Sequence, residues 1–145
     1  MMLGLKIKIL DENATMPSRA KKGDSGLDLT SVYRTMIPPG ETRLLATGLA
    51  ASVPEGYEIQ IRPRSGIALK TELVIKNSPG TIDCNFRGEI KIIVKNTSTD
   101  LVEIPPNYKI AQMVVCPVLL WEPELVTDLD VTERGTGGFG STGLY

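Results

Sequence analysis

The sequence predicts an all-β fold of the jelly-roll-like kind, a β-sandwich or barrel with a flexible glycine-rich C-terminal arm. Apolar and polar residues alternate over 5–9 and 57–61, which is the period of a half-buried strand. Turn sequences such as IPPG, VPEG, NSPG and IPPN separate these stretches at the roughly 8–12-residue spacing of sandwiches and barrels. A helical pattern is confined to one turn, SGIALK at 65–70.

We expect about nine strands in all. They are placed at 5–9, 27–33, 41–47, 57–61, 73–76, 89–95, 101–104 and 108–116, with a hairpin-like segment at 77–90. The chain has 145 residues, of which 41% are hydrophobic and 23% are charged. That length and balance predict one domain that buries its own core without a disulfide or a structural metal.

The single domain, 1–145, divides by composition into a β core at 1–121, an acidic tether at 122–133 and a glycine-rich flap at 134–145. The tether contains Glu122, Glu124, Asp128, Asp130 and Glu133 and no basic residue. Residues 118–133 could extend roughly 50 Å, enough to reach over a neighbouring subunit. Because glycine loses the most backbone entropy on ordering, we expect the flap to be mobile without a ligand.

Composition excludes several classes of site. With no histidine, the chain has no Ser-His-Asp triad, no histidine base and no HExxH zinc site. Cys84 and Cys116 lack the CxxC spacing of a redox or zinc motif and suit a reducing compartment. A net charge of −1 indicates no global affinity for nucleic acid, and no apolar run approaches a membrane span or signal peptide. We therefore expect a cytoplasmic protein with neither nucleic-acid nor membrane partners.

Two stretches could bind phosphate. In RPRSGIALK, Arg64, Ser65 and Gly66 gather a guanidinium, a hydroxyl and backbone N–H groups around one point; the alternative is a charged strand end with an N-cap serine. The flap has the letters GxGxxG but neither follows a strand nor opens a helix, so the dinucleotide-loop interpretation fails. The flap is then either a disordered terminus or a ligand-closing segment. Its potential contacts are Arg134, Ser141 and Thr142 for phosphate and Phe139 for stacking.

Three polar residues lie in apolar surroundings. Asp28 and Gln112 interrupt apolar strands and need partners when buried; for Asp28 the alternatives are an arginine salt bridge and a role in a site. Asp83 lies near a turn, where a strand edge is free to bind a ligand. It is either a turn residue that satisfies local amides or, since histidine is absent, a general base.

In this order, SGLDL (25–29), PRSGIA (63–68), GTIDCNFRGEI (80–90), KIAQMVV (109–115) and RGTGGFGSTG (134–143) resemble the five motifs of the trimeric dUTP diphosphatases, or dUTPases. The resemblance implies a jelly-roll homotrimer with three active sites at its subunit interfaces. It also implies Mg²⁺-dependent hydrolysis of dUTP to dUMP and pyrophosphate, which keeps uracil out of DNA and supplies dUMP for thymidylate synthesis.

The resemblance also assigns roles to residues. Asp83 would activate the water that attacks the α-phosphorus, and Asp28 would support the metal indirectly, through water. The expected phosphate contacts are Arg64, Ser65, Gly66, Gln112, Arg134, Ser141 and Thr142. Most of the rate acceleration would come from charge neutralisation around the phosphates.

Uracil presents an N3–H donor between two carbonyl acceptors, a pattern that an extended backbone and an amide can read. The expected reader is Asn77 with Gly80, Thr81 and Ile82, returning toward Lys91 in a tight hairpin that excludes the thymine methyl. Cytosine would leave buried polar groups unpaired. Phe86 stands where the family commonly has tyrosine and would exclude a ribose 2′-hydroxyl, while Asn85 replaces a frequent second acid. Phe139 would stack on uracil.

Two other functions remain open at this stage. A dCTP deaminase shares the jelly-roll core, but this chain is short for that family and lacks an obvious glutamate beside PRSG. A relative that binds dUTP without hydrolysing it would have the same fold and no turnover.

Overall fold

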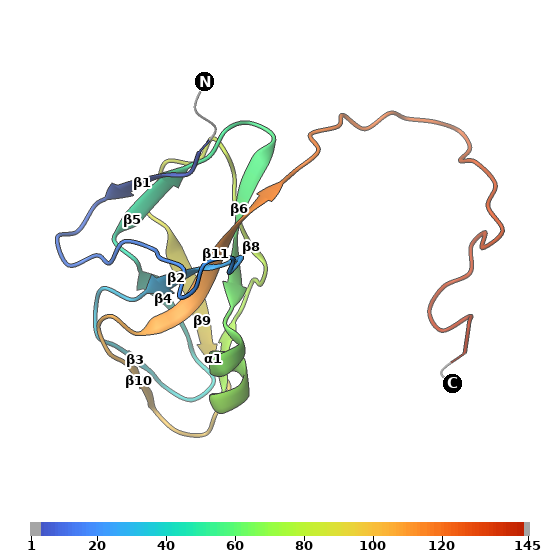
Figure 1. Cartoon of the computed structure of the whole chain (residues 1–145). Helices are drawn as coiled ribbons and strands as arrows, with labels where there is room; N and C mark the ends of the chain where they lie inside the picture. The colour runs from blue at the N-terminus through green and yellow to red at the C-terminus, as the bar shows by residue number, and fades with distance from the viewer. Residues whose placement is uncertain (1–3, 144–145) are drawn as a thin grey trace.

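The computed structural model describes residues 4–143, and this part of the chain contains eleven strands and one short helix (Figure 1). The elements are β1 (Lys6–Ile9), β2 (Leu27–Thr30), β3 (Thr35–Ile37), β4 (Thr42–Ala46), β5 (Leu49–Ser52), β6 (Tyr57–Pro63), α1 (Ser65–Lys70), β7 (Leu73–Ile75), β8 (Gly80–Ile82), β9 (Lys91–Asn96), β10 (Val102–Ile104) and β11 (Lys109–Pro117). The predicted all-β, jelly-roll-like fold is confirmed.

The strands pair antiparallel in four small sheets. The largest has the order β2-β11-β6-β8, a second has the order β4-β9-β7, and β1-β5 and β10-β3 form two-stranded ribbons. At nine residues β11 is the longest strand, and it pairs with β2 on one side and β6 on the other. Segments far apart in sequence are therefore joined through β11 (Figure 1).

The core lies where the sheets face each other. The period-two alternation of β6 buries Ile59 and Ile61, while Glu58, Gln60 and Arg62 point to the other face. Ile92 and Val94 from β9 and Met113 from β11 are likewise buried in this core. Full burial of each such side chain contributes about 1.5–3 kcal/mol, which fixes the strand register that the site depends on.

The chain forms more strands than the nine predicted, because β3 and β5 lack a clear alternating pattern. In β5, Leu49, Ala50 and Ala51 are all buried, so both faces of the strand are apolar and period two is lost. The strand predicted at 27–33 ends at Thr30, where Ser31 N–H donates to the Tyr108 carbonyl.

The prediction that residues 77–90 form a hairpin-like segment is wrong. β8 pairs with β6 and not with a chain neighbour, and no strand occupies residues 83–90. The next strand begins at Lys91 and not at Glu89. The Glu89 carboxylate instead accepts the Gly48 N–H at 3.0 Å, and Ile90 N–H donates to the Leu49 carbonyl at 2.7 Å.

The long loop before β2 is fastened beside β5. Tyr33 donates a hydrogen bond to Asp11, which lowers the pKa of Asp11 and raises the pKa of Tyr33. Gly48 has φ +67°, and a Cβ there would lie 2.8 Å from the Ala14 side chain, so only glycine lets the loop cross this closely. The fastened loop then runs to residues 18–26 at the edge of the candidate site.

The predicted helical turn at 65–70 is confirmed as α1, but its cap differs from the N-cap serine considered above. Arg64 occupies the N-cap position with extended backbone and no side-chain capping bond, and Ser65 is the first helical residue. The Ser65 hydroxyl is therefore not committed to capping the helix.

Beyond β11 the arm leaves the body. Val118 N–H donates to the Gly56 carbonyl at 2.9 Å, after which residues 122–133 are all exposed and extend away from the strands (Figure 1). Flap residues 134–143 form turns without helix or strand, and residues 144–145 of the predicted flap and 1–3 of the predicted domain lie outside the described residues. The mobility of the flap stays a prediction. Within 4–143, no helix is long and apolar enough to cross a membrane.

Candidate active site

A cleft of about 290 Å³ lies where β2, β11 and the end of β6 meet. It is lined by Ala20, Asp24, Ser25, Gly26, Asp28, Arg64, Ser65, Gly66 and Gln112. Five residues predicted to contact phosphate or support the metal are thus brought together, namely Asp28, Arg64, Ser65, Gly66 and Gln112. The cause is the register of β11, because Gln112 lies opposite both Asp28 on β2 and Arg62 on β6.

Asp28 is the anionic centre of this cleft. Arg64 Nε lies 3.0 Å from its Oδ1 and Lys109 Nζ lies 3.0 Å from its Oδ2, and its side chain is 15% exposed. The partner that a strand-interior aspartate requires is thus an arginine, joined by a lysine that the sequence did not indicate. The register of β11 against β2 shifts between Lys109 and Ala111, and such a shift re-aims a side chain.

Gln112 joins three segments through one side chain. Its Nε2 donates to the Pro63 carbonyl at the end of β6, at 2.8 Å. Its Oε1 lies directly over Gly26, where a Cβ would be only 2.0 Å away. Gly26 is therefore required here, because any side chain would displace Gln112. Gly26 was missed as a site residue because its role depends on a contact between segments distant in sequence.

Arg64, just after β6, contacts both β2 and β11. Besides Asp28, it reaches the Lys109 carbonyl through Nη1 at 2.9 Å. A guanidinium has five N–H donors, so these contacts leave others for an anion. Gly66 has nothing within 4 Å of where its Cβ would lie, so the backbone is open at the start of α1.

Asp83 lies in a different place on the same chain. It follows β8 in a turn closed by the Phe86 N–H and the Asp83 carbonyl at 3.1 Å, and it lines a hollow with Glu58 and Asn85. Among residues 4–143 no donor reaches its exposed carboxylate. The sequence left open that Asp83 is a turn residue whose carboxylate accepts hydrogen bonds from local amides. In the structure the carboxylate accepts none of these bonds.

The two places are separated by the length of β6. Ile82 pairs with Ile59, so Asp83 follows beside Glu58 at one end of β6, while Arg64 follows the other end. Seven strand residues at ~3.3 Å each put the two groups on the order of 20 Å apart. We refer to the predicted phosphate contacts around Arg64 as the phosphate half-site and to Asp83 with its turn as the carboxylate half-site; within one chain they lie apart.

The predicted uracil reader lies between the half-sites. β8 pairs with β6 alone, so the other edge of Gly80, Thr81 and Ile82 is free within the described residues. Asn77 covers this strand, because a Cβ at Gly80 would lie 3.2 Å from its Nδ2. The Lys91 ammonium lies 3.7 Å from the Glu89 carboxylate. The free backbone edge of β8, together with the side-chain amide of Asn77, can form hydrogen bonds with the edge of one base.

Phe86 and the flap complete the predicted set. The Phe86 ring is 41% exposed and crosses Gly88, where a Cβ would lie 2.6 Å from Cζ. Phe139 is fully exposed, and Arg134 Nε donates to the Gly137 carbonyl at 2.8 Å. The structure does not bring the flap residues to either half-site of their own chain; these are Arg134, Phe139, Ser141 and Thr142.

The donor set fits a magnesium ion that arrives with a triphosphate. Within residues 4–143, no three carboxylate, thiol or imidazole groups converge as they would to hold a metal alone. Mg²⁺ is commonly bound by one or two carboxylates together with water and substrate phosphates. Asp28 suits an indirect role, because its Oδ2 faces the Lys109 ammonium at 3.0 Å but receives no hydrogen bond of good geometry, which leaves a lone pair for a metal-bound water.

A family model for dUTPase matches residues 12–143 of this chain. The chain belongs to the dUTPase family. It is 50% identical to the deoxyuridine 5′-triphosphate nucleotidohydrolase of Clostridium acetobutylicum over 143 residues, covering 99% of each chain. It is 48% identical to that of Clostridioides difficile, covering 99% of this chain and 100% of the relative. Among solved structures, the dUTPase of Staphylococcus bacteriophage 80alpha with dUPNHPP is similar, with a TM-score of 0.92 and 32% identity over 97% of this chain and 99% of that one.

We expect Gly26→Ala to damage the cleft around Asp28 and Gln112 without unfolding the chain. The added Cβ would collide with Gln112 Oε1, and a flexible side chain can move away at small cost in stability. Displacing Gln112 breaks its hydrogen bond to the Pro63 carbonyl and should raise the KM for dUTP up to about tenfold, at roughly the 0.5–1.5 kcal/mol of one ordinary hydrogen bond. Steady-state kinetics and thermal melting check this. Gly4→Ala, at an open position, is the matched control; equal KM values for the two variants would contradict the role of Gly26.

Proposed function

We propose that this dUTPase hydrolyses dUTP in a homotrimer in which the phosphate half-site of one subunit and the carboxylate half-site of another act on the same nucleotide. The activity, hydrolysis of dUTP to dUMP and pyrophosphate, follows from family membership and from about 50% identity over the full length of named enzymes. The observation that carries the shared site is the separation of Asp83 from Arg64 along β6 within one chain.

The phosphate half-site binds and neutralises the triphosphate. Arg64 offers N–H donors beyond those it spends on Asp28 and Lys109, Ser65 offers an uncommitted hydroxyl, and Gln112 is fixed by Pro63. These groups are held before substrate arrives, so little reorganisation is needed when charge develops on the leaving pyrophosphate. Asp28 keeps Arg64 and Lys109 in place and is a positioning residue.

Magnesium, when bound with the triphosphate, would neutralise phosphate charge and so make the leaving pyrophosphate more stable. The residues that would hold it are Asp28 through water and the substrate's own phosphates. Because the chain supplies no complete ligand set of its own within 4–143, the metal requirement should appear together with nucleotide binding.

Asp83 would act on the attacking water. Its carboxylate accepts a proton from that water while the water oxygen bonds to the α-phosphorus, and the bond from the α-phosphorus to the bridging oxygen breaks, releasing pyrophosphate. The free carboxylate and its exposed position at the end of β8 support this role. Asn85 nearby cannot substitute for it, because an amide does not accept the proton at neutral pH.

Selectivity for uracil over cytosine would come from the open edge of β8. Its backbone, with Asn77, can pair with the O2–N3–O4 edge of uracil, and cytosine would leave these groups unpaired. The Phe86 ring, supported on Gly88, would exclude a 2′-hydroxyl by its shape alone. The flap would close over the base and phosphates through Phe139 and Arg134, drawn from a neighbouring subunit.

The activity test is pyrophosphate release from dUTP with Mg²⁺, run beside dCTP, dTTP and UTP and repeated with EDTA. We expect rapid release from dUTP alone and its loss with EDTA. Ammonia release from dCTP would favour the deaminase, and tight dUTP binding without turnover would favour the non-catalytic relative. Release from all four nucleotides would contradict the roles of Asn77 and Phe86.

We expect Asp83→Asn to lower kcat at least 10²-fold, the scale typical of losing a general base, while dUTP binding persists. Glu55→Gln removes another carboxylate from the same hollow and should keep kcat close to that of the unaltered protein. Single-turnover kinetics and calorimetric titration with a non-hydrolysable analogue separate the two effects. A kcat for Asp83→Asn equal to that of the unaltered protein would refute the assignment.

Deleting residues 134–145 should leave a folded trimer of severely reduced activity, because the flap adds no contacts to its own body within the described residues. Light scattering gives the oligomeric state, circular dichroism the fold, and pyrophosphate release the activity. A truncated trimer with full activity would show that the flap has no part in turnover.

The shared site can be tested by mixing these two inactive forms. Co-refolding equal amounts of Asp83→Asn and the flap-deleted chain should recover about a quarter of full activity, since each site draws an intact Asp83 and an intact flap from different subunits at even odds. Each form refolded alone is the control. No recovery, despite mixed trimers seen by mass spectrometry, would mean that Asp83 and the flap of one chain serve the same site.

A further inference from the structure

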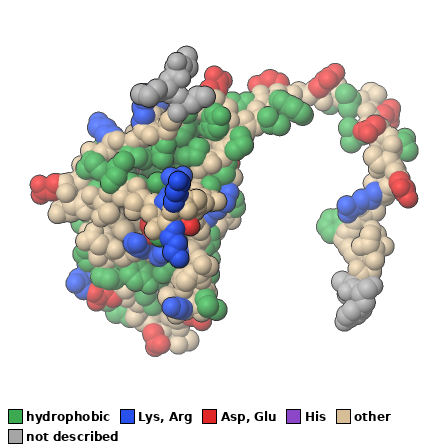
Figure 2. Space-filling view, viewed as in Figure 1, with side chains coloured by type: hydrophobic (Ala, Val, Ile, Leu, Met, Phe, Trp, Pro, Cys, Tyr) green, Lys and Arg blue, Asp and Glu red, His purple; other side chains and the backbone are tan. Residues whose placement is uncertain are grey.

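The loop that precedes β2 carries three cations at the rim of the cleft around Asp28. We call residues 18–26, which read SRAKKGDSG, the rim loop, and four of them line the cleft. The cations are Arg19, Lys21 and Lys22, and all three residues are exposed. Figure 2 shows Lys and Arg side chains gathered near the middle of the visible face, in the region of β2 and β11 in Figure 1. Neither half-site includes any of the three.

Hydrogen bonds hold the rim loop in one shape. The Asp24 N–H donates to the Lys21 carbonyl at 3.2 Å, and the Lys21 N–H donates to Asp24 Oδ2 at 2.9 Å, which closes a four-residue turn. Gly23 is third in this turn and has φ +93°, a left-handed conformation that glycine adopts without strain. Arg19 Nε donates to the Asp24 carbonyl at 2.7 Å. The turn is thus built from backbone groups and the Asp24 carboxylate, so substitution of the Lys21 or Lys22 side chain leaves its hydrogen bonds in place.

The positive charge of the rim loop is not neutralised by the chain. Within residues 4–143, no carboxylate forms a salt bridge with Arg19, Lys21 or Lys22. Asp24 is the only acid in the loop, and Asp28 behind it is already shared by two other cations. The cleft and its rim therefore contain five cations against two carboxylates, in a chain whose net charge is −1. This region attracts anions although the molecule as a whole is slightly acidic.

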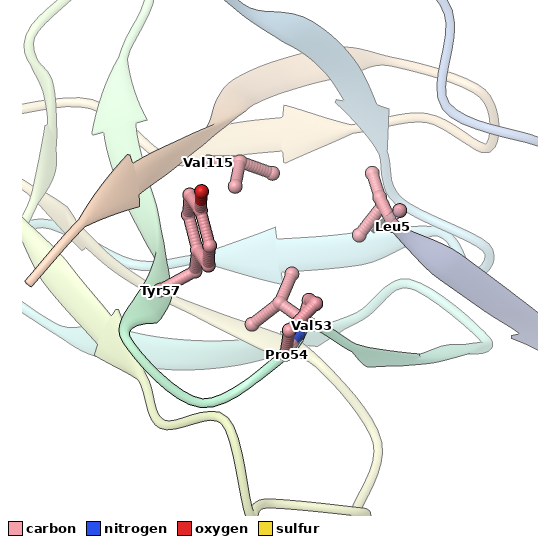
Figure 3. Close-up of a pocket in the computed structure, with 6 residues that line it drawn as sticks. Leu5, Val53, Pro54, Tyr57 and Val115 are labelled. Atoms are coloured by element: carbon pink, nitrogen blue, oxygen red, sulfur yellow. The ribbon is translucent and has the colours of Figure 1, made fainter. Parts of the chain in front are cut away.

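Two other cavities lack this combination of charge and position. One, of about 190 Å³, lies at the start of β1 and is apolar. Its side chains are Leu5, Val53, Pro54, Tyr57 and Val115 (Figure 3). The other, a groove of about 260 Å³ along β1 and β5, contains Lys6, Lys8 and Arg87 but shares no lining residue with the cleft around Asp28. Of these places, only the rim loop adds excess cations to the cleft.

From this arrangement we infer that Lys21 and Lys22 capture the triphosphate of dUTP: they attract it to the cleft and then bind its terminal phosphate. This capture step rests on the proposed function, whose substrate it binds. A cleft lined by one sign of charge can raise the association rate of an oppositely charged ligand by about 10–10³-fold. Lysine suits the task because its ammonium is a point charge on a flexible stem, which can follow a phosphate as it moves inward to the fixed fork of Arg64.

The first measurement is the association rate constant of the full-length protein with Mg²⁺ and α,β-imido-dUTP, a non-hydrolysable analogue. Lys21→Gln/Lys22→Gln should lower this constant about tenfold at low salt, and the difference should shrink at about 500 mM salt, where exposed charges are screened within roughly 4 Å. Lys6→Gln/Lys8→Gln removes the same charge from the separate groove and is the matched control, with an unchanged rate constant expected. An unchanged rate constant in the rim-loop variant, or an equal loss in both variants, would overturn the capture step.

The contact with the terminal phosphate is measured separately, by calorimetric titration. Lys21→Gln/Lys22→Gln should weaken binding of α,β-imido-dUTP about tenfold more than binding of dUMP, which lacks the terminal phosphates. Lys21→Arg/Lys22→Arg keeps both charges and should bind the analogue as the unaltered protein does. Equal weakening for the two nucleotides, in variants whose fold is verified by thermal melting, would overturn the contact. Pyrophosphate release from dUTP reports separately on the proposed function, because the analogue binds without being hydrolysed.

Discussion

The ion cluster around Asp28 is the interaction on which the site depends. Asp28 lies on β2, Lys109 at the start of β11 and Arg64 just after β6, and the two cations lie 3.0 Å from the two carboxylate oxygens. Only Asp28 is largely withdrawn from water, with 15% of its side chain exposed against 32% for Arg64 and 52% for Lys109, so its carboxylate is the group that needs the pairing most. The cluster therefore fixes the position of Arg64 before any phosphate is present.

Gln112 adds geometry to this electrostatic constraint. The same side chain bonds the end of β6 and lies over Gly26, so the three segments that line the cleft share one contact point. The proposed chemistry follows from such rigidity, because donors held in advance stabilise charge without rearranging. The carboxylate half-site is the opposite kind of structure, a turn with an exposed Asp83 whose oxygens are not bound by the chain.

Much of this could be predicted from the sequence, for physical reasons. Alternation over 57–61 and the turn dipeptides fixed the fold class, and the need of a strand-interior Asp28 for a partner was met by Arg64. Three features depend on contacts between distant segments, and the sequence could not indicate them. They are the burial of β5 on both faces, the pairing of β8 with β6, and the close approach of Gln112 to residue 26, which leaves room only for glycine. The separation of Asp83 from Arg64 likewise appears only once the register of β6 is known.

The shortness of β8 has a consequence for solubility. A strand kept open to read a base is also an exposed edge, and exposed edges recruit strands from other molecules. β8 has three residues, enough hydrogen-bonding groups for one pyrimidine and too few to template a neighbouring strand. Pro79 precedes it and Asp83 follows it, so an imino acid and a charge bound the edge at either end. Asp83, the residue that we propose activates water, is thus also placed to protect the substrate-free protein against aggregation.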